Sequence, residues 1–587
     1  MAEVLPSDLL HYYKRELSYL RDQGADFARR YPKVAAMLAL HGSESLDPHT
    51  ERLIESVAFL AARVHRDLDR EFPQVASALL DNLCPALLQP VPSMSIAQFQ
   101  LDPTQGKVTA GFPVARHTGL FASASDGQQC RFRTAWDTVL WPVQVSFAAI
   151  EGGNTLRLDL ECSADTDFSE LALDQLRIHI QGDWMTTMPL YEFLVSDVLS
   201  VGLTPAGEST RALPPGSWRE VGFGENENLL PLPANAQPAY GMMQEYFAFP
   251  RKFHFFDLCN LRAPGAPVRR MVVRIRFDQP ARGLAAVSAE NFQLGCTPIV
   301  NLFARVSEPI LFDHRHYEYR LVGDRQREAS TEVHSIVSVI ASEPNAERPQ
   351  RIPSFAALGH AWSSEPSCFW SARREHSLRQ DISGTDVFLS FVDPSNAPAA
   401  PQQPVLYAHL LCTNRRLAEQ VPSRARMHVE GAASIASVRC LYEPTAQRNP
   451  PLGSETLWRL VSLLTLNHQS LVDGSTGKEQ LREMLSLFAS DSARDHEQIR
   501  GILDLRARSV TGRIGRDAWR GYCRGTEVTL EFDEEAFVGG SRLLLSAVLA
   551  RFFALYTSVN SFVQLRVQRG DEVWKKWEPM SGRQVIL

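Results

Sequence analysis

One short segment, Gly241–Leu258 (GMMQEYFAFPRKFHFFDL), places six aromatic rings within eleven residues, with a proline among them. Burying one such side chain contributes about 1.5–3 kcal/mol, so a folded chain does not leave this many rings in water. The segment must therefore pack into the protein's own core or onto a partner. It contains no nucleophile beside a base and no set of metal ligands, so it predicts packing and gives no sign of catalysis.

The bulk properties of the chain are those of a multidomain globular protein. Its 587 residues are 44% hydrophobic and 22% charged, enough for roughly three to five domains. The formal net charge of −7 gives no basic surface for nucleic acid or for an anionic membrane. The nine cysteines are scattered singly, which indicates reduced thiols in a cytoplasmic protein.

No segment predicts secretion or membrane insertion. The N-terminus lacks a basic stretch followed by an apolar core, so no signal peptide is expected. The longest apolar candidate, Leu543–Val559, is interrupted by Arg551 and is too short to span a bilayer. We therefore expect a soluble, cytoplasmic protein without direct membrane insertion.

Hydrophobic periodicity divides the chain into four parts and predicts a multidomain α+β fold. The first part has the pattern of amphipathic helices, and short alternating runs such as SIAQFQL and VVRIRF follow it. Near the C-terminus, expected strands at Thr526–Phe532 and Phe562–Val567 flank a helix at Ser541–Ser561. The expected parts are a helical N-terminal region (1–92), a β-rich central domain (93–330), a second β-rich module (331–448) and an α+β C-terminal domain (449–587).

A helix beginning at Asp47-Pro48, an N-cap followed by proline at the first helical position, carries a regular apolar stripe. Its apolar residues recur at steps of four and three: Leu53, Val57, Leu60, Val64 and Leu68. Such a stripe seats a helix against another helix, either within the chain's own core or, in part, in a bundle with a different chain. A separate helix is expected from Gln74 to Leu88.

The chain holds no complete catalytic, cofactor or metal motif. The segment Gly474–Lys478 (GSTGK) resembles a phosphate loop, but Val472 stands where the first glycine is needed and Glu479 follows the lysine. His314 and His316 alternate along an expected strand, without a third metal ligand nearby. We therefore predict no enzyme activity, no cofactor and no metal.

Several longer segments follow one another along the chain. They are YYKRELSYLRDQGADFARRYPKVA (Tyr12–Ala35), DPHTERLIESVAFLAARV (Asp47–Val64), PVPSM (Pro90–Met94), EYFAFPRKFHFFDL (Glu245–Leu258), CTPIVNLF (Cys296–Phe303), LLCTNRRL (Leu410–Leu417), WRLVSLLTLNHQSL (Trp458–Leu471), the stretch Phe537–Leu565 and a closing WKKWEPMSGRQVIL (Trp574–Leu587). Together they resemble the TssF family, also called VasA or ImpG, whose members are baseplate wedge subunits of bacterial type VI secretion systems.

The resemblance implies a structural, non-enzymatic role. Members of the family pair as two copies with one TssG to form a wedge. Six wedges surround the VgrG spike, contact the TssK adaptor and TssE, and seed the contractile sheath. The resemblance further implies a baseplate docked at the inner-membrane complex, and no nucleic acid is expected among the partners.

Three surfaces are candidates for contacts with these partners. They are the helix stripe (Leu53, Val57, Leu60, Val64), the aromatic segment (Tyr246, Phe247, Phe249, Phe253) and the C-terminal helix (Arg551, Phe552). Each is equally compatible with the chain's own core, because motifs of large apolar residues generally report packing.

Two other classes of function remain open from the residues alone. A carbohydrate-binding or carbohydrate-active multidomain β protein would need exposed rings for stacking on sugars, and the candidates are Trp136, Trp141, Trp184 and Trp370. A nucleic-acid-binding module is disfavoured by the negative net charge.

Overall fold

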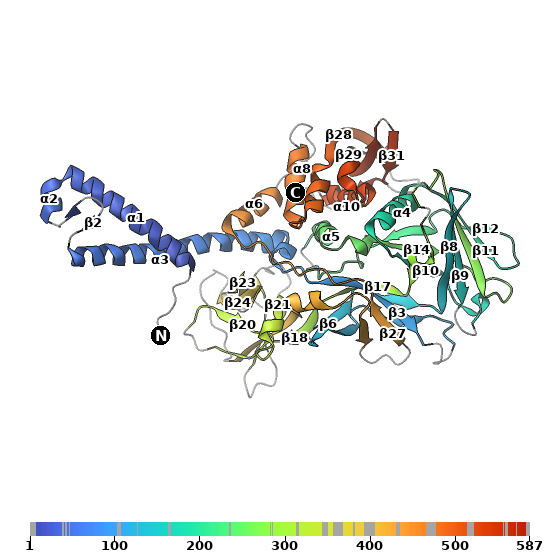
Figure 1. Cartoon of the computed structure of the whole chain (residues 1–587), viewed down its shortest axis with the longest axis horizontal. Coiled ribbons are helices and arrows are strands. Elements are labelled where there is room, and N and C mark those ends of the chain that lie inside the picture. The colour runs from blue at the N-terminus through green and yellow to red at the C-terminus, as the bar shows by residue number, and fades with distance from the viewer. Residues whose placement is uncertain are drawn as a thin grey trace. The chain divides into compact units, whose positions relative to one another are not determined.

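The computed structural model shows a mixture of helices and strands in several sheets (Figure 1), which confirms the α+β fold class. The structure describes residues 7–37, 40–41, 44–45, 47–102, 107–125, 127–162, 166–233, 236–281, 283–284, 286–312, 316–342, 350–355, 368–377, 379, 382–392, 405–429, 435–464, 477–513, 522–555, 557, 561–570 and 572–582. The chain forms two compact units, which we call the helical unit (Met1–Leu80 with Pro451–Val461) and the barrel unit (Asp81–Pro450 with Ser462–Leu587).

The helical unit is built from long helices. It contains α1 (Ser7–Arg30), α2 (Pro32–Met37), most of α3 (Pro48–Leu83), the start of α6 (Ser454–Leu464), and the paired short strands β1 (Leu40–His41) and β2 (Glu44–Ser45). The start of α3 is capped as expected. The Asp47 carboxylate accepts hydrogen bonds from the backbone N–H of His49 (3.1 Å) and from the Thr50 hydroxyl (2.9 Å).

α3 is a single helix of 36 residues, so the prediction of a separate helix from Gln74 to Leu88 was wrong. The helix passes through Pro73, where a proline removes one backbone hydrogen bond and costs about 3 kcal/mol. Helical residues on both sides outweigh this local cost, because helix propagation is cooperative. Pro85–Leu88, at the end of the expected range, forms the short 3₁₀ helix η1.

Ion pairs connect α1 to α3. Arg21 pairs with Glu51, and the Nδ1 atom of His65 lies 2.9 Å from a carboxylate oxygen of Glu16. Among the described residues of this unit few side chains are fully buried, and on α3 they include the small Ala58. Two helices bring together only one narrow apolar seam, so the unit has little core of its own.

The barrel unit is organised around a closed six-stranded barrel. Its strands, in hydrogen-bonding order, are β17 (Cys296–Val300), β3 (Met94–Leu101), β27 (Ile435–Cys440), β26 (Arg426–Val429), β5 (Gly119–Ser123) and β6 (Gln129–Thr134). The short strands β4 (Phe112–Val114) and β7 (Thr138–Leu140) pair with each other. Because β26 and β27 come from the expected second module (331–448), a boundary between residues 330 and 331 does not separate two sheet modules.

Two open antiparallel sheets belong to the middle of the chain. The β9 sheet has the order β12 (Arg211–Ala212), β11 (Val198–Pro205), β15 (Arg270–Phe277), β9 (Thr155–Cys162) and β8 (Val143–Glu151). The β14 sheet has the order β13 (Trp218–Val221), β14 (Phe255–Cys259), β10 (Gln175–Ile180) and β16 (Phe292–Leu294). Between β10 and β11 the chain forms α4 (Trp184–Ser196), which the Asp183 side chain caps.

Two further sheets pack face to face as a sandwich. The β25 sheet has the order β18 (Phe303–Val306), β25 (Val405–Thr413), β21 (Glu332–Ser342) and β22 (Gln350–Ile352), and β19 (Ile310–Leu311) also pairs with β25. The β24 sheet has the order β20 (Tyr319–Leu321), β24 (Thr385–Val392) and β23 (Phe369–His376). The two share one hydrophobic cluster, in which Val339 and Leu406 join Val387 and Leu389. The linker expected at Asp393–Pro404 lies outside the described residues.

The C-terminal part combines helices with one mixed sheet. The helices are α8 (Gly477–Phe488), α9 (Ala493–Arg500) and α10 (Arg542–Leu555). The sheet has the order β28 (Ile502–Arg513), β29 (Tyr522–Phe532), β30 (Phe562–Arg569) and β31 (Glu572–Lys576), with β32 (Met580–Ser581) also on β30. β29 and β30 pair in parallel, and α10 provides the crossover that parallel neighbours require.

The aromatic segment is buried inside the barrel unit. It forms α5 (Pro238–Ala248), the 3₁₀ helix η4 (Pro250–Phe253) and β14. α5 packs against α10, where the rings of Tyr240 and Phe552 lie 6.0 Å apart. Of the two outcomes open to this segment, the structure therefore shows the internal core.

A buried ion pair lies within this segment. The Lys252 ammonium contacts one carboxylate oxygen of Glu245, and both side chains are at most 1% exposed. The other oxygen of Glu245 accepts hydrogen bonds from the backbone N–H groups of Leu229 (2.7 Å) and Leu230 (3.0 Å). One carboxylate thus holds α5, η4 and a neighbouring loop together through charge-assisted bonds.

We predict that Lys252→Met lowers the free energy of unfolding by about 3–5 kcal/mol, because it leaves the buried Glu245 carboxylate without its cation. Adding Glu245→Gln should recover most of this loss, since the glutamine oxygen still accepts from the Leu229 N–H. Denaturant unfolding of the full chain measures both variants. Equal losses in the single and the double variant would contradict the role given to the ion pair.

Candidate functional site

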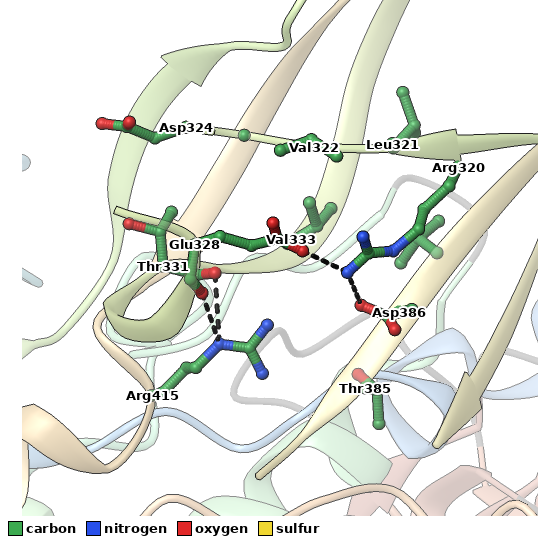
Figure 2. A pocket seen from close by; sticks show the side chains of 12 residues that line it. Arg320, Leu321, Val322, Asp324, Glu328, Thr331, Val333, Thr385, Asp386 and Arg415 are labelled. Carbon is green, nitrogen blue, oxygen red and sulfur yellow. Dashed lines mark hydrogen bonds and ion pairs between the residues drawn. The ribbon is translucent and has the colours of Figure 1, made fainter. Parts of the chain in front are cut away.

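A small polar pocket lies between β20 and β24 (Figure 2). Arg320 pairs there with Glu328 and, at 2.8 Å, with Asp386. The Nε atom of Arg415 donates to the backbone carbonyl oxygens of Glu328 and Thr331, at 3.2 Å each. In Figure 2 these charged groups point toward one another, and the free volume of about 10 Å³ holds no more than one water molecule. The pocket is too small for a substrate.

A buried ion pair continues this network. Glu332 and Arg415 have side chains that are 0% and 5% exposed, with oxygen and nitrogen 3.4 Å apart. Glu332 also accepts from the backbone N–H of Thr385 (2.8 Å) and from the Gln447 side-chain amide (2.7 Å). Because these carboxylates all have partners, the cluster stabilises the sandwich and offers no free acid or base for catalysis.

Two buried histidines lie in an aromatic cluster. The ring of His254 contacts those of Trp184 and Tyr191, with centroids 5.8 and 5.9 Å apart, and neither of its nitrogens has a hydrogen-bond partner among the described residues. Burial lowers the pKa of His254 well below its ordinary value and the pKa of His179 to about 3. Both rings are therefore neutral at pH 7, and neither is hydrogen-bonded to a carboxylate.

The described part of the chain holds no group of three or more His, Cys, Asp or Glu side chains that could bind a metal ion. All nine cysteines are free, and seven of them are buried. Burial raises the pKa of the Cys84 and Cys412 thiols to about 12, so these thiols are protonated and unreactive. None of the helices in the described ranges is long and apolar enough to cross a membrane.

The remaining sequence candidates for chemistry are the pair His314 and His316 and the loop-like motif Gly474–Lys478. His314 and Gly474–Thr476 lie outside the described residues. Lys478, the lysine of the loop-like motif, sits in the first turn of α8 and donates to the backbone oxygen of Leu503 at 3.3 Å.

The four tryptophans considered for sugar stacking form no exposed platform. Trp136 is 2% exposed, and the other three, Trp141, Trp184 and Trp370, are partly buried. No observation at these rings favours the carbohydrate-binding alternative.

The apolar stripe of α3, in contrast, faces solvent. The exposed fractions of Leu53, Val57, Leu60 and Val64 are 65%, 45%, 60% and 57%, whereas Ala58 is fully buried. These four side chains do not belong to the chain's own core. The alternative role, a bundle with a different chain, stays a prediction. The side chain of Leu68 lies outside the described residues.

Unpaired cations border this stripe. Arg52 and Arg63 are exposed and form no ion pair with any described residue. Their spacing of eleven residues returns to the same side of a helix after three turns, so both flank one edge of the stripe. Tyr19 on α1 is 58% exposed, and Tyr31, which directly follows α1, is 56% exposed. Sequence reasoning missed both rings, because a single exposed tyrosine on or beside an amphipathic helix gives little signal.

The other predicted contact residues lie inside the chain. Arg551 is half-buried, with its guanidinium 4.0 Å from the ring centroid of Phe223. Five apolar residues are at most 6% exposed: Tyr246, Phe247, Phe249, Phe253 and Phe552. The expectation that they offer a partner surface is corrected, because the chain's own core already covers their rings.

Comparisons with known proteins agree with one another. A family model described as "Type VI secretion system, TssF" matches residues 5–584. The protein named "Type VI secretion system component TssF1" from Pseudomonas aeruginosa is 33% identical over 614 aligned positions, which cover 98% of each chain.

Solved structures share the fold. A chain in the cryo-electron microscopy structure of the type VI secretion TssK–TssF–TssG baseplate subcomplex matches with a TM-score of 0.74 and 22% identity, covering 91% of this chain and 99% of its own. A chain of "the baseplate complex from the type VI secretion system" matches with a TM-score of 0.60 and 23% identity, covering 98% and 100%.

We predict that His254→Phe makes the barrel unit less sensitive to acid. Since burial holds the pKa of His254 below the unfolded value, the unfolded chain gains a proton that the folded one lacks, and stability falls as pH drops below about 6.5. Removing this histidine should reduce the pH dependence of unfolding free energy by up to about 1.4 kcal/mol per pH unit. Denaturant unfolding at pH 7, 6 and 5 measures this.

The exposed His428 on β26 provides the matched control, as His428→Phe makes the same chemical change without altering the buried cluster. Parallel pH profiles for the wild-type chain and His254→Phe would contradict the prediction.

Proposed function

Because this chain belongs to the TssF family of type VI secretion proteins, we propose that it is a structural, non-enzymatic wedge subunit of the baseplate. The observation that carries the proposal is the apolar stripe of α3, four large aliphatic residues at helical spacing, all at least 45% exposed. A structural subunit needs such uncovered faces to bind its neighbours, whereas an enzyme needs a pocket with reactive groups.

The stripe supports a helical bundle as the mode of assembly. Leu53, Val57, Leu60 and Val64 form one narrow apolar row, which is the seam that helices of a bundle bury against each other. Among the described side chains of the helical unit, too few are buried to form a finished bundle. Helices contributed by another chain would complete its core and remove the stripe from water. Arg52 and Arg63 at its edge would pair with carboxylates of those helices.

The proposed assembly contains two copies of this chain and one TssG. In it the chain also contacts the TssK adaptor, TssE, the VgrG spike and the sheath, in the cytoplasm at the inner-membrane complex. The solved relatives support the TssG and TssK part of this proposal, as one is a TssK–TssF–TssG subcomplex and the other a baseplate complex. No catalysis, cofactor or nucleic acid enters the proposal.

We predict that the double variant Val57→Asp, Leu60→Glu binds the TssG-like protein of the same secretion system at least 100-fold more weakly than the wild-type chain does. Burying two aliphatic side chains contributes about 3–6 kcal/mol, and charges at these positions would oppose that burial. Co-expression with the TssG-like protein and native mass spectrometry of the purified complex measure the loss. The wild-type chain should give a 2:1 complex.

The control is Leu199→Glu, which introduces a negative charge at a leucine that is 59% exposed on β11 of the barrel unit. The unfolding free energy of each variant alone should match that of the wild-type chain, since both sites are exposed. An unchanged 2:1 complex in the double variant would remove the stripe from the interface. A wild-type chain that ignores TssG would remove the wedge proposal itself.

A further inference from the structure

The β25 sheet has an outer face that is apolar. Along β25, Leu406, Ala408 and Leu410 point into the sandwich core, so the alternate residues point away from it. The register brings neighbours onto the same outer face: Ile340 of β21 lies opposite Tyr407, Val306 of β18 opposite His409, and Leu311 of β19 opposite Val405. We call this surface the β25 face; it consists of Val306, Leu311, Val337, Ile340, Arg351, Val405, Tyr407, His409 and Leu411 with the serines of β21 between them.

Solvent reaches the β25 face. Val306, Leu311 and Val337 are 52%, 67% and 56% exposed. Over the described strands, its basic groups are His409 near the centre and Arg351 on the edge strand β22, and no carboxylate belongs to the face. Arg351 is exposed and has no ion-pair partner in the described part of the chain.

Other solvent-facing sheets of this chain differ from it. On the β9 sheet, Arg157 bridges Glu151 and Asp159, at 2.8 and 2.6 Å. On the outer side of the β24 sheet, within the same sandwich, Arg320 pairs with Asp386 at 2.8 Å. Antiparallel sheets with one wet face normally carry polar residues there. The β25 face breaks this rule, and depletion of charge around exposed aliphatic and aromatic residues is typical of the centre of a protein interface.

The dimensions of the β25 face limit what can cover it. Seven residues of β25 span about 24 Å, and the three spacings between the four strands span about 14 Å. The area of the β25 face is therefore about 340 Å². A stable pair of globular surfaces buries about 800 Å² on each side, so this face is too small to hold two copies of the chain together alone. An α-helix is about 10–12 Å wide, and 24 Å corresponds to about 16 helical residues.

We propose that the β25 face binds one amphipathic α-helix, about four turns long, contributed by another protein chain. The helix presents an uncharged apolar side to Val306, Tyr407 and Ile340, and a carboxylate at its edge to Arg351. The argument from charge is complementarity: over its described strands, the face has one arginine without an ion-pair partner, Arg351, and no carboxylate. This surface goes beyond the proposed function, because it lies on the barrel unit and does not depend on the stripe of α3.

The experiment replaces Tyr407 in the full chain with the photo-crosslinking residue p-benzoylphenylalanine, in cells that assemble the apparatus. After irradiation, mass spectrometry maps the crosslinked peptide. The expected product joins residue 407 to the apolar side of a helix in another chain, with an acidic residue within two turns of the crosslinked position. The same photoprobe at the exposed Leu199 of the β9 sheet is the control and should not crosslink to that helix.

A charge swap provides the second measurement. Arg351→Glu should reduce the crosslink at least tenfold, and reversing the acidic residue of the mapped helix should restore it. Arg351 is exposed, so Arg351→Glu should leave the unfolding free energy of the chain unchanged. The proposal is overturned by a crosslink to the β25 face of a second copy, by a crosslink to this chain's own helices, or by no crosslink in cells with assembled baseplates. A crosslink that Arg351→Glu leaves unchanged also overturns it.

Discussion

The barrel is closed by pairing between strands that are far apart in the chain. β3 pairs on one side with β27, placing Ala97 opposite Cys440, and on the other side with β17. The contact continues beyond the strands, since Val91 and Arg448 exchange backbone hydrogen bonds at 2.8 and 3.0 Å. Pairing of strands so far apart stabilises the fold only after the chain between them has lost its conformational freedom.

The two units differ in how far their large apolar side chains are buried. In the barrel unit the aromatic segment meets α10, and even the charges within it, Glu245 and Lys252, are paired and fully buried. In the helical unit the four large aliphatic residues of the stripe of α3 are at least 45% exposed. A chain gains nothing in its own folding from a regular stripe left uncovered, so the regularity of that stripe is best explained by a surface outside the chain.

Local patterns in the sequence predicted local structure well. The Asp47-Pro48 cap, the alternating strands and the strand–helix–strand unit near the C-terminus follow from residue periodicity, and the structure describes them close to the expected positions. Barrel topology could not be predicted this way, because pairing between residues near 97 and near 440 leaves no local signal. The start of a separate helix at Gln74 was predicted wrongly, since α3 continues through Pro73 and the penalty of one proline is local.

Candidate surfaces for contacts with partners were harder to predict from the sequence than the helices and strands. The same pattern of large apolar residues occurs in the stripe of α3 and in the aromatic segment, yet the first is exposed and the second is buried. Periodicity identifies which side of an element is apolar and says nothing of what covers that side. The β25 face was missed for a related reason: both sides of β25 are apolar, and in a sequence such a strand cannot be told from one buried on both faces.

The stripe of α3 and the β25 face share one arrangement of apolar and charged residues. The stripe of α3 has Arg52 and Arg63 at its edge, and the β25 face has Arg351 at its edge, while the centre of each carries no carboxylate. An apolar centre supplies affinity and tolerates partners of different shape, whereas a charge at the rim mainly selects orientation and rejects cationic surfaces. This division would serve the proposed role in an assembly with more than one partner. In that assembly the apolar centres would pack against neighbouring chains, and the arginines at the rims would orient them.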